Sequence, residues 1–177
     1  MAAIYSKDDQ MKVERLYRAY QRTMYYVAYE ILQDHYLAED AVHQAFLRII
    51  TVLPRIHEHN GHKTKGFLVV VCRNVAYDIY KQRMHTVEED FANLVDDGAM
   101  DSLELVIQDE FIEELTGCIQ QLKPIYRDII ILRYAHELTY EEIAAVLQIS
   151  NAAVRKRIER ARKMLIPLLR KKEEKIG

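Results

Sequence analysis

Basic side chains gather in one short segment near the C-terminal end of the chain. They are Arg155, Lys156, Arg157 and Arg160. Guanidinium and ammonium groups pair with phosphate oxygens and with the acceptor edge of guanine, so this segment is suited to bind nucleic acid. The net charge of the 177 residues is only −2, which by itself argues against a nucleic-acid binder. The distribution of the charge is therefore more informative than its sum.

The charge is strongly segregated along the chain. No lysine or arginine lies between Met84 and Leu122, and this stretch holds a block of acidic residues. The block consists of Glu88, Glu89, Asp90, Asp96, Asp97, Asp101, Glu104, Asp109, Glu110, Glu113 and Glu114. Because its first half also lacks a sustained apolar face, we predict a flexible acidic linker over residues 85–102. The linker would join two small helical domains, residues 8–84 and 103–177.

Composition indicates an all-α fold. Half of the residues are hydrophobic, while only 5 glycines and 3 prolines interrupt the chain. Apolar residues recur at helical intervals and alternating strand patterns are scarce. The two cysteines, Cys72 and Cys118, lie far apart in apolar helical stretches, and no secretory leader or membrane-length apolar run is found. We expect a cytoplasmic protein without membrane contact of its own.

The basic segment is expected to lie on the second helix of a helix-turn-helix. Thr139 and Glu142 have the spacing of a capping box, so a helix should start at Tyr140. Residues 148–150 form the turn, and Ser150 is a suitable N-cap for the next helix. That helix would bury one apolar stripe, made of Val154, Ile158, Ala161 and Leu165.

The opposite surface of the second helix is the candidate DNA reader. It carries Asn151, Ala152, Arg155, Lys156 and Glu159, with Arg157 and Arg160 on its flanks. A helix that enters the major groove by its N-terminal end presents its side chains in this way. The alternative interpretation is that this is only a charged, solvated helix. The combination of a capped first helix, a short turn and a basic second helix favours DNA binding instead.

Residues 37–53 form a second candidate helix. Its core stripe consists of Val42, Ala45, Phe46, Ile49 and Leu53. Asp40, Gln44, Leu47 and Thr51 line another face. A leucine on a polar face is usually just exposed, but beside a carboxylate and an amide it suits a hot spot for a partner helix.

Residues 65–83 form a third candidate helix, preceded by a loop over residues 54–64. Asn74, Asp78 and Lys81 follow one another at intervals of four and three, so amide, carboxylate and ammonium groups share one face. A base displaced from the stack needs polar groups for its edge, and a loop rich in His, Asn and Gly could supply them.

Catalytic chemistry is not indicated. His57, His59 and His62 have spacings that could hold a metal and would suit a metal-dependent nuclease, but no cysteine nearby completes the ligand set. We expect solvated loop histidines and neither metal nor cofactor. Cys72 lies in an apolar run and is expected to be a packing residue. Phosphate-binding glycine loops and nucleophile elbows are lacking, so we predict a protein that is not an enzyme.

Five segments together resemble bacterial sigma factors of the extracytoplasmic-function (ECF) type, in the sigma-70 family. The C-terminal segments IIILRY, LTYEEIAAVLQIS and AVRKRIERARKML are similar to the fourth conserved region of that family. LAEDAVHQAFLRIITVL is similar to the second region, and KGFLVVVCRNVAYDIYKQR carries the aromatic-leucine, arginine-asparagine and aspartate pattern of the same region. Gln148 stands where the family often has glycine.

The resemblance implies three binding surfaces. Core RNA polymerase would be bound by Glu39, Asp40, His43, Gln44, Phe46 and Leu47. The minus-10 promoter element would be opened and held by Asn60, Gly61, His62, Phe67, Arg73, Asn74, Asp78 and Lys81. The minus-35 element would be recognised by Asn151, Ala152, Arg155, Lys156, Arg157 and Arg160.

The function implied is that of an alternative sigma factor, which directs core RNA polymerase to promoter DNA and is held by an anti-sigma factor. An alternative is a stand-alone helix-turn-helix regulator that binds an operator as a dimer without polymerase. This hypothesis predicts a symmetric footprint on the operator DNA. It does not explain why residues 37–53 and 65–83 resemble sigma factors.

Overall fold

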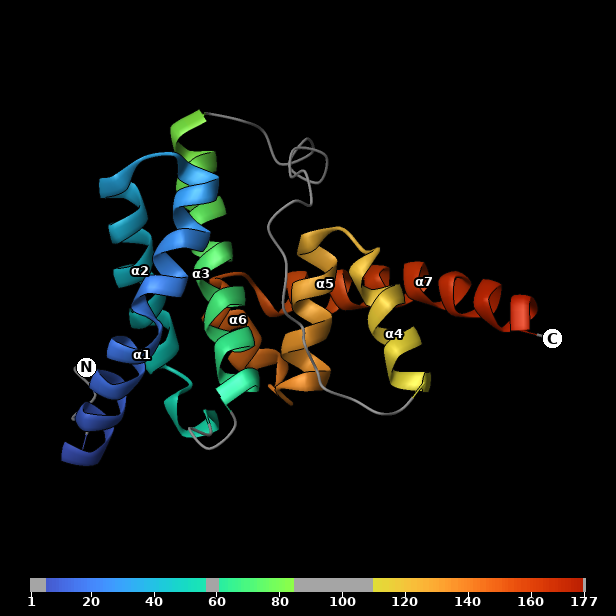
Figure 1. Ribbon diagram of the computed structural model, residues 1–177, viewed down its shortest axis with the longest axis horizontal. Coiled ribbons are helices and arrows are strands. Elements are labelled where there is room, and N and C mark those ends of the chain that lie inside the picture. Colours follow the sequence, from blue (N-terminus) through green and yellow to red (C-terminus); the bar gives the residue numbers. More distant parts are fainter. Residues whose placement is uncertain (1–5, 57–60, 85–109, 177) are drawn as a thin grey trace. The chain divides into compact units, whose positions relative to one another are not determined.

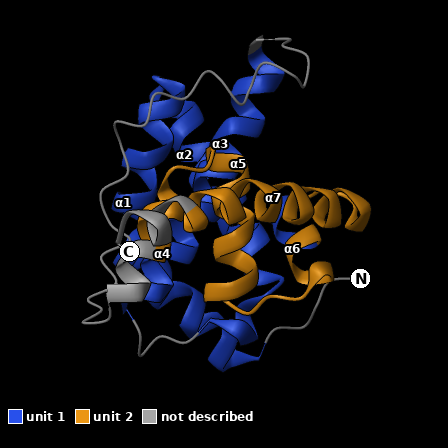
Figure 2. Cartoon of the chain, turned by 90° about the vertical axis from the view of Figure 1, so that its right-hand side faces the viewer, with its two compact units in different colours: residues 1–87, 145–147 blue, residues 88–144, 148–177 orange. Residues whose placement is uncertain are grey.

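The computed structural model describes residues 6–56, 61–84 and 110–176, and every regular element in them is helical. The all-α prediction is therefore confirmed. The chain divides into two compact units, residues 1–87 with 145–147 and residues 88–144 with 148–177 (Figure 2). The predicted linker, residues 85–102, lies outside the described residues. None of the described helices carries an apolar run that would span a lipid bilayer.

The N-terminal unit is built from three helices that each pack on the other two (Figure 1). They are α1 (Lys7–Leu32), α2 (His35–Ile50) and α3 (Gly61–Met84). The apolar stripe expected on the second helix is buried, since Val42, Ala45, Phe46, Ile49 and Leu53 are at most 5% exposed. Burial of the four larger side chains contributes roughly 1.5–3 kcal/mol each, which helps to hold the three helices together.

The turn between α1 and α2 is tight because local caps end one helix and start the next. Gln33 closes α1 in the left-handed region (φ 50°), and its amide donates to the Tyr29 carbonyl over 2.8 Å. The Asp34 carboxylate accepts from the Leu37 amide over 3.1 Å and caps α2. The two helices therefore form a hairpin.

The prediction of a loop over residues 54–64 is wrong at the C-terminal end of that range. A short 3₁₀ turn, η1 (Leu53–Arg55), follows α2, and α3 already begins at Gly61. Tertiary packing extends the helix, because Thr64 is only 4% exposed and Tyr20 donates its hydroxyl to the Gly61 carbonyl over 3.4 Å. Lys12 donates to the Leu53 carbonyl over 2.9 Å, so α1 fixes both ends of the remaining connection.

The C-terminal unit is described from α4 onward. Its elements are α4 (Glu110–Gln120), α5 (Pro124–Ile130), the π-helical turn η3 (Ile131–Ala135), α6 (Tyr140–Leu147, apart from residues 145–147) and α7 (Asn151–Ile176). Pro124 occupies the first position of α5, where its missing amide costs nothing. α7 packs against α4 and α5.

The helix-turn-helix has the predicted caps. Thr139 and Glu142 form the capping box, with the Glu142 amide donating to Thr139 Oγ1 (3.1 Å) and the Thr139 amide donating to Glu142 Oε2 (2.8 Å). Gln148 ends α6 in the left-handed region (φ 52°). Ser150 Oγ accepts from the Ala153 amide (3.1 Å) and caps α7.

The predicted apolar stripe of α7 is buried over its first three members only. Val154, Ile158 and Ala161 are at most 3% exposed, whereas Leu165 is half-buried. Met164 and Ile166, beside it, are 42% and 48% exposed. The apolar side chains of α7 therefore become more exposed to solvent toward its C-terminal half.

Candidate DNA and protein interfaces

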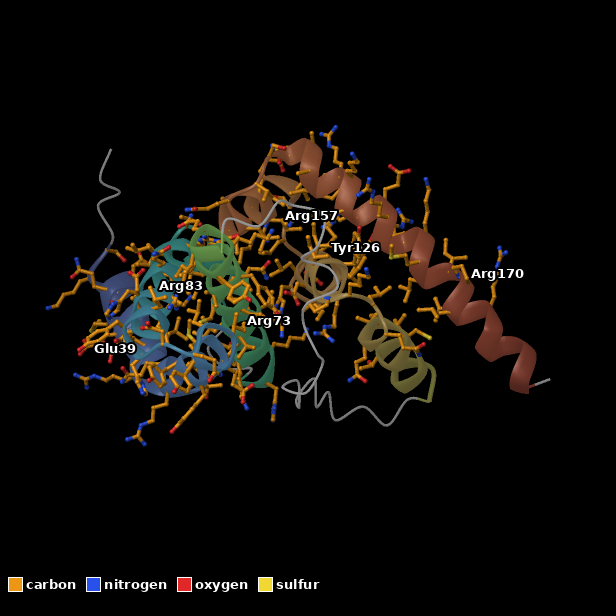
Figure 3. The ribbon with its side chains drawn as sticks, turned by 90° about the horizontal axis from the view of Figure 1, so that it is seen from above. Glu39, Arg73, Arg83, Tyr126, Arg157 and Arg170 are labelled. Atoms are coloured by element: carbon orange, nitrogen blue, oxygen red, sulfur yellow. The ribbon has the colours of Figure 1, made fainter. Side chains whose placement is uncertain are left out.

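The basic surface of α7 is exposed at its N-terminal end. Asn151, Ala152, Arg155, Lys156, Glu159 and Arg160 are exposed, and Arg157 is half-buried. Figure 3 shows Arg157 near the start of α7 and Arg170 far along the same helix. Since the N-terminal end of a helix also carries partial positive charge, this surface is suited to meet a polyanion.

Arg155 is held by an aromatic ring that the sequence had not singled out. Its guanidinium carbon lies 6.0 Å from the centroid of the Tyr140 ring, and that of Arg133 lies 5.5 Å from the same centroid. Tyr140 is the first residue of α6, so it links the capped start of the first helix to the reading face of the second. Cation–π contacts of this kind are worth about 0.5–1 kcal/mol at exposed sites.

The π-helical turn η3 places Arg133 for this contact. The His136 amide donates to the Ile131 carbonyl over 3.1 Å, which is the wide hydrogen bond of a π-turn. Arg133 Nη1 then donates to the Leu138 carbonyl over 3.0 Å. The turn thus places the Arg133 guanidinium over the Tyr140 ring, which Arg155 also contacts.

Glu159 is the one carboxylate on the reading face of α7. It accepts a hydrogen bond from Lys163 over 2.7 Å, and this bond is the largest cause that lowers the pKa of the Glu159 carboxyl. Glu159 is therefore ionised, and its charge is partly offset by the neighbouring ammonium group.

The face of α2 that points away from the core carries the predicted partner residues. Asp40 Oδ2 accepts from the side-chain Nε2 of Gln44 over 2.7 Å, and Leu47 is 68% exposed. Phe46 lies apart from these residues, because it is only 5% exposed and packs against Tyr17 with 5.1 Å between ring centroids. Phe46 supports the surface from beneath.

The candidate minus-10 residues differ in accessibility. Gly61 and His62 are exposed at the start of α3, whereas Phe67 and Arg73 are only 3% and 4% exposed. The side-chain Nδ2 of Asn74 donates to the Val70 carbonyl over 2.8 Å. Asn60 lies outside the described residues, so the structure places seven of the eight candidates.

Asp78 takes part in an ion pair that sequence reasoning missed. Arg48 Nη2 of α2 donates to Asp78 Oδ2 of α3 over 2.9 Å. The two residues lie 30 positions apart, and an arginine within an apolar helix gave no signal of its partner. The pair joins the candidate polymerase helix to the candidate minus-10 helix.

Cys72 is a packing residue, as predicted. Its thiol donates to the Met24 carbonyl over 3.3 Å, and burial raises its pKa to about 12. Among the described residues, no group of three metal-ligating side chains comes together. His57 and His59 lie outside them.

Both halves of the chain match sigma-70 families. Residues 16–86 match sigma-70 region 2, and residues 112–165 match region 4. The chain belongs to the sigma-70 family, in its ECF type. As a sigma factor, it is a transcription initiation factor that directs RNA polymerase to promoters.

Similar curated proteins agree with this assignment. ECF RNA polymerase sigma factor SigM of Bacillus subtilis is 29% identical over 157 residues, which cover 88% of this chain and 93% of SigM. SigW of the same organism is 25% identical, over 93% of this chain and 92% of SigW. A solved structure of the sigma factor RpoE in complex with the anti-sigma factor NepR from Bartonella quintana is 22% identical, with a TM-score of 0.44, and covers 93% of this chain and 98% of that one.

Proposed function

We propose that this sigma factor docks on core RNA polymerase through the exposed face of α2. The observation that carries the proposal is that Leu47, which is 68% exposed, lies one turn from Gln44 and two turns from Asp40, and that these two polar side chains are hydrogen-bonded to each other. An apolar side chain bordered by polar groups is the composition of an interface hot spot with its rim. His43 and Glu39 are exposed on the same helix, and Phe46 holds the face from below.

Promoter contacts are divided between the two units in this proposal. Asn151, Ala152, Arg155 and Lys156 of α7 read base edges of the minus-35 element, while Arg157 and Arg160 bind phosphates. Exposed Gly61 and His62, together with Asn74, Asp78 and Lys81, meet the opened minus-10 element. The two buried candidates, Phe67 and Arg73, keep α3 in place instead of touching DNA.

The acidic linker serves as a tether between the two promoter-binding units. Polymerase binding raises the effective concentration of both units at the promoter, which compensates for the low net charge of the chain. We further propose that the protein acts in the cytoplasm, needs no cofactor, is not an enzyme by itself and is controlled by an anti-sigma factor.

The decisive experiment is competition for core RNA polymerase against a labelled sigma factor. Asp40→Ala and Leu47→Ala should each weaken binding by about tenfold or more, as loss of a hot-spot contact does. Glu30→Ala is the control, since Glu30 is exposed on α1 and lies outside the docking face of α2. Binding of promoter DNA without any binding of polymerase would favour the stand-alone regulator.

A further inference from the structure

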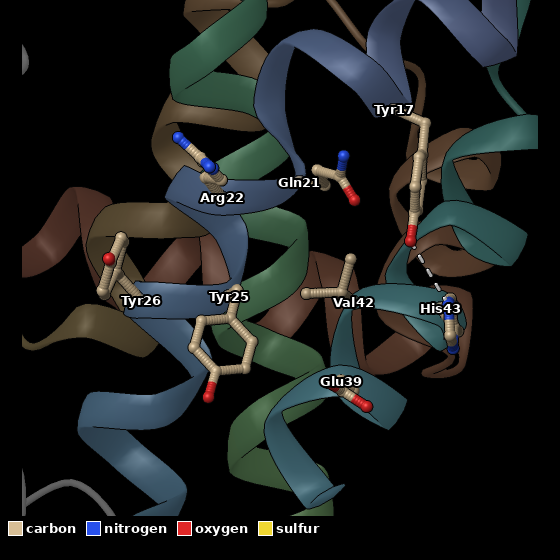
Figure 4. A pocket seen from close by; sticks show the side chains of 8 residues that line it. All are labelled: Tyr17, Gln21, Arg22, Tyr25, Tyr26, Glu39, Val42 and His43. Atoms are coloured by element: carbon tan, nitrogen blue, oxygen red, sulfur yellow. Dashed lines mark hydrogen bonds between the residues drawn. The ribbon is translucent and has the colours of Figure 1, made fainter. Parts of the chain in front are cut away.

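Exposed carboxylates lie on the proposed binding faces of both units. Glu39 lines a groove between α1 and α2 together with several tyrosines, on the side assigned to polymerase (Figure 4). Glu159 lies on the reading face of α7, where the other side chains are neutral or basic. A carboxylate repels the phosphates of DNA. A helix that bound only the DNA backbone would therefore be better served by another residue at position 159.

Glu159 occupies a position from which a recognition helix can reach base edges. The reading face consists of residues at intervals of one, three, one and three, which keeps them on one side of α7: Asn151, Ala152, Arg155, Lys156 and Glu159. Val154 and Ile158 are buried on the other side of the helix, so this side faces solvent. Glu159 is the member farthest from the Ser150 cap, and it extends the reading face to about two and a half turns.

Among the described residues, Glu159 pairs with the lysine one turn after it and not with the arginine one turn before it. Opposite charges four residues apart on a helix commonly pair, and Arg155 has this spacing from Glu159. The Arg155 guanidinium lies instead 6.0 Å from the centroid of the Tyr140 ring, while Glu159 Oε1 accepts from Lys163 Nζ over 2.7 Å. Arg155 and Glu159 therefore remain separate, one as a donor and one as an acceptor.

The Glu159 carboxylate retains an oxygen that can face DNA. Its side chain is 65% exposed, and Oε2 forms no hydrogen bond within the described part of the chain. An ionised carboxylate only accepts hydrogen bonds, so its partners in the major groove are the amino groups of cytosine (N4) and adenine (N6). Cytosine fits better, because adenine places the N7 acceptor beside N6, and that acceptor repels a carboxylate.

We propose that Glu159 is a specificity-determining residue, which accepts a hydrogen bond from N4 of a cytosine in the minus-35 element. Arg155 binds the edge of a guanine nearby. Residues four apart are separated by about 6 Å along a helix, and base pairs by about 3.4 Å, so the two bases lie no more than about two base steps apart. The proposal rests on the recognition of minus-35 DNA by α7, which is part of the proposed function.

The first test selects minus-35 sequences from a randomised library with the full-length chain bound to core RNA polymerase. The wild type should enrich cytosine at one position, and Glu159→Ala should lose this preference while it keeps the others. Glu159→Gln should shift the preference toward adenine, because a glutamine amide bonds N6 and N7 of adenine together. Glu141→Ala is the matched control, since it removes an exposed carboxylate of α6 outside the reading face and should retain the cytosine.

A second measurement removes the hydrogen-bond donor from the DNA. The selected cytosine is replaced by a pyrimidinone analogue that lacks the N4 amino group. The wild-type complex should bind this DNA about tenfold more weakly, whereas Glu159→Ala should bind both DNAs nearly alike. Circular dichroism of each variant checks that the helices are intact.

Three results would overturn the proposal while minus-35 recognition by α7 stands. The first is a wild-type selection that favours other bases but no cytosine. The second is an equal loss on the analogue in wild type and Glu159→Ala. The third is a Glu159→Ala variant that binds every sequence more tightly with unchanged preference, which would make the carboxylate only a source of phosphate repulsion. A wild type without any minus-35 preference would overturn both this proposal and the recognition on which it rests.

Discussion

Arg48 of α2 and Asp78 of α3 form an ion pair in which the two partners differ greatly in exposure. Their Nη2 and Oδ2 atoms are 2.9 Å apart, and the side chains are 6% and 43% exposed. The second terminal nitrogen of Arg48, Nη1, is buried and has no hydrogen-bond partner in the structure. The carboxylate can therefore be hydrated on its own, whereas the guanidinium depends on its partner.

This asymmetry predicts that removing the exposed partner is worse than removing the buried one. Asp78→Ala leaves a buried charge uncompensated and should lower the free energy of unfolding by about 2–3 kcal/mol, somewhat less than for a fully buried pair. Arg48→Met keeps apolar volume and lets Asp78 hydrate, so it should cost about 1 kcal/mol. Urea unfolding followed by circular dichroism measures both, and the reverse order would contradict this account.

The contact between Tyr140 and Arg155 predicts an effect on promoter binding from a residue of α6. Tyr140→Leu should weaken binding of minus-35 DNA by about two- to fivefold, because Arg155 loses a cation–π contact. Tyr140→Phe retains the ring and should bind nearly as the wild type does. Equal losses in the two variants would indicate that the hydroxyl, not the ring, matters. Fluorescence anisotropy with the polymerase complex gives the affinities.

Arg155 and Arg160 should differ in what their removal does to DNA recognition. Arg155→Ala should relax sequence preference at one position of the minus-35 element and cost about 1–3 kcal/mol on the preferred sequence. Arg160→Ala should weaken all sequences alike and reduce the salt slope by about one. Binding to a panel of single-base substitutions at several salt concentrations separates the two roles. A sequence-independent loss in Arg155→Ala would assign that residue to phosphate.

The helix-turn-helix was largely predictable because its signals are local. Thr139 and Glu142 predicted the capping box, Ser150 predicted the next cap, and both lie where expected. Spacing likewise separated buried Val42 from exposed Leu47 on α2. Caps and helical periodicity depend on neighbours within four residues, so a sequence carries them directly.

Relationships between distant residues were not predictable. The partner of Arg48 lies 30 positions away, and the ring beneath Arg155 belongs to another helix. The predicted loop over residues 54–64 failed for the same reason, since burial of Thr64 extends α3 toward Gly61. Phe67 and Arg73 matched a family pattern, but such a pattern does not show which side chains are buried by tertiary packing. Tertiary contacts decide these features, and periodicity within one helix does not report them.

The two cysteines should report on the unfolding of each unit separately. Cys72 lies in the N-terminal unit and Cys118 in the C-terminal unit, and both are fully buried. Burial raises the pKa of Cys72 to about 12, so this thiol holds almost no thiolate at pH 8. Alkylation should therefore require opening of the surrounding helices. Peptide mapping after pulses of iodoacetamide across a urea gradient gives one transition for each site, and rapid labelling of Cys72 in native protein would contradict the prediction.

Gln148 offers a way to stabilise the turn of the helix-turn-helix. Its φ of 52° lies in the left-handed region, where a side chain costs about 1 kcal/mol and glycine costs little. The Gln148 amide donates to the Ala144 carbonyl, and glycine would keep this backbone bond. The Gln148 side chain is exposed, so its loss removes no core packing. Gln148→Gly should therefore raise the free energy of unfolding by up to about 1 kcal/mol, with Glu137→Gly, at φ 56°, as a second left-handed position for comparison. Thermal unfolding followed at the Cys118 site measures the change in this unit, and a lower melting temperature for Gln148→Gly would show that the side chain itself stabilises the turn.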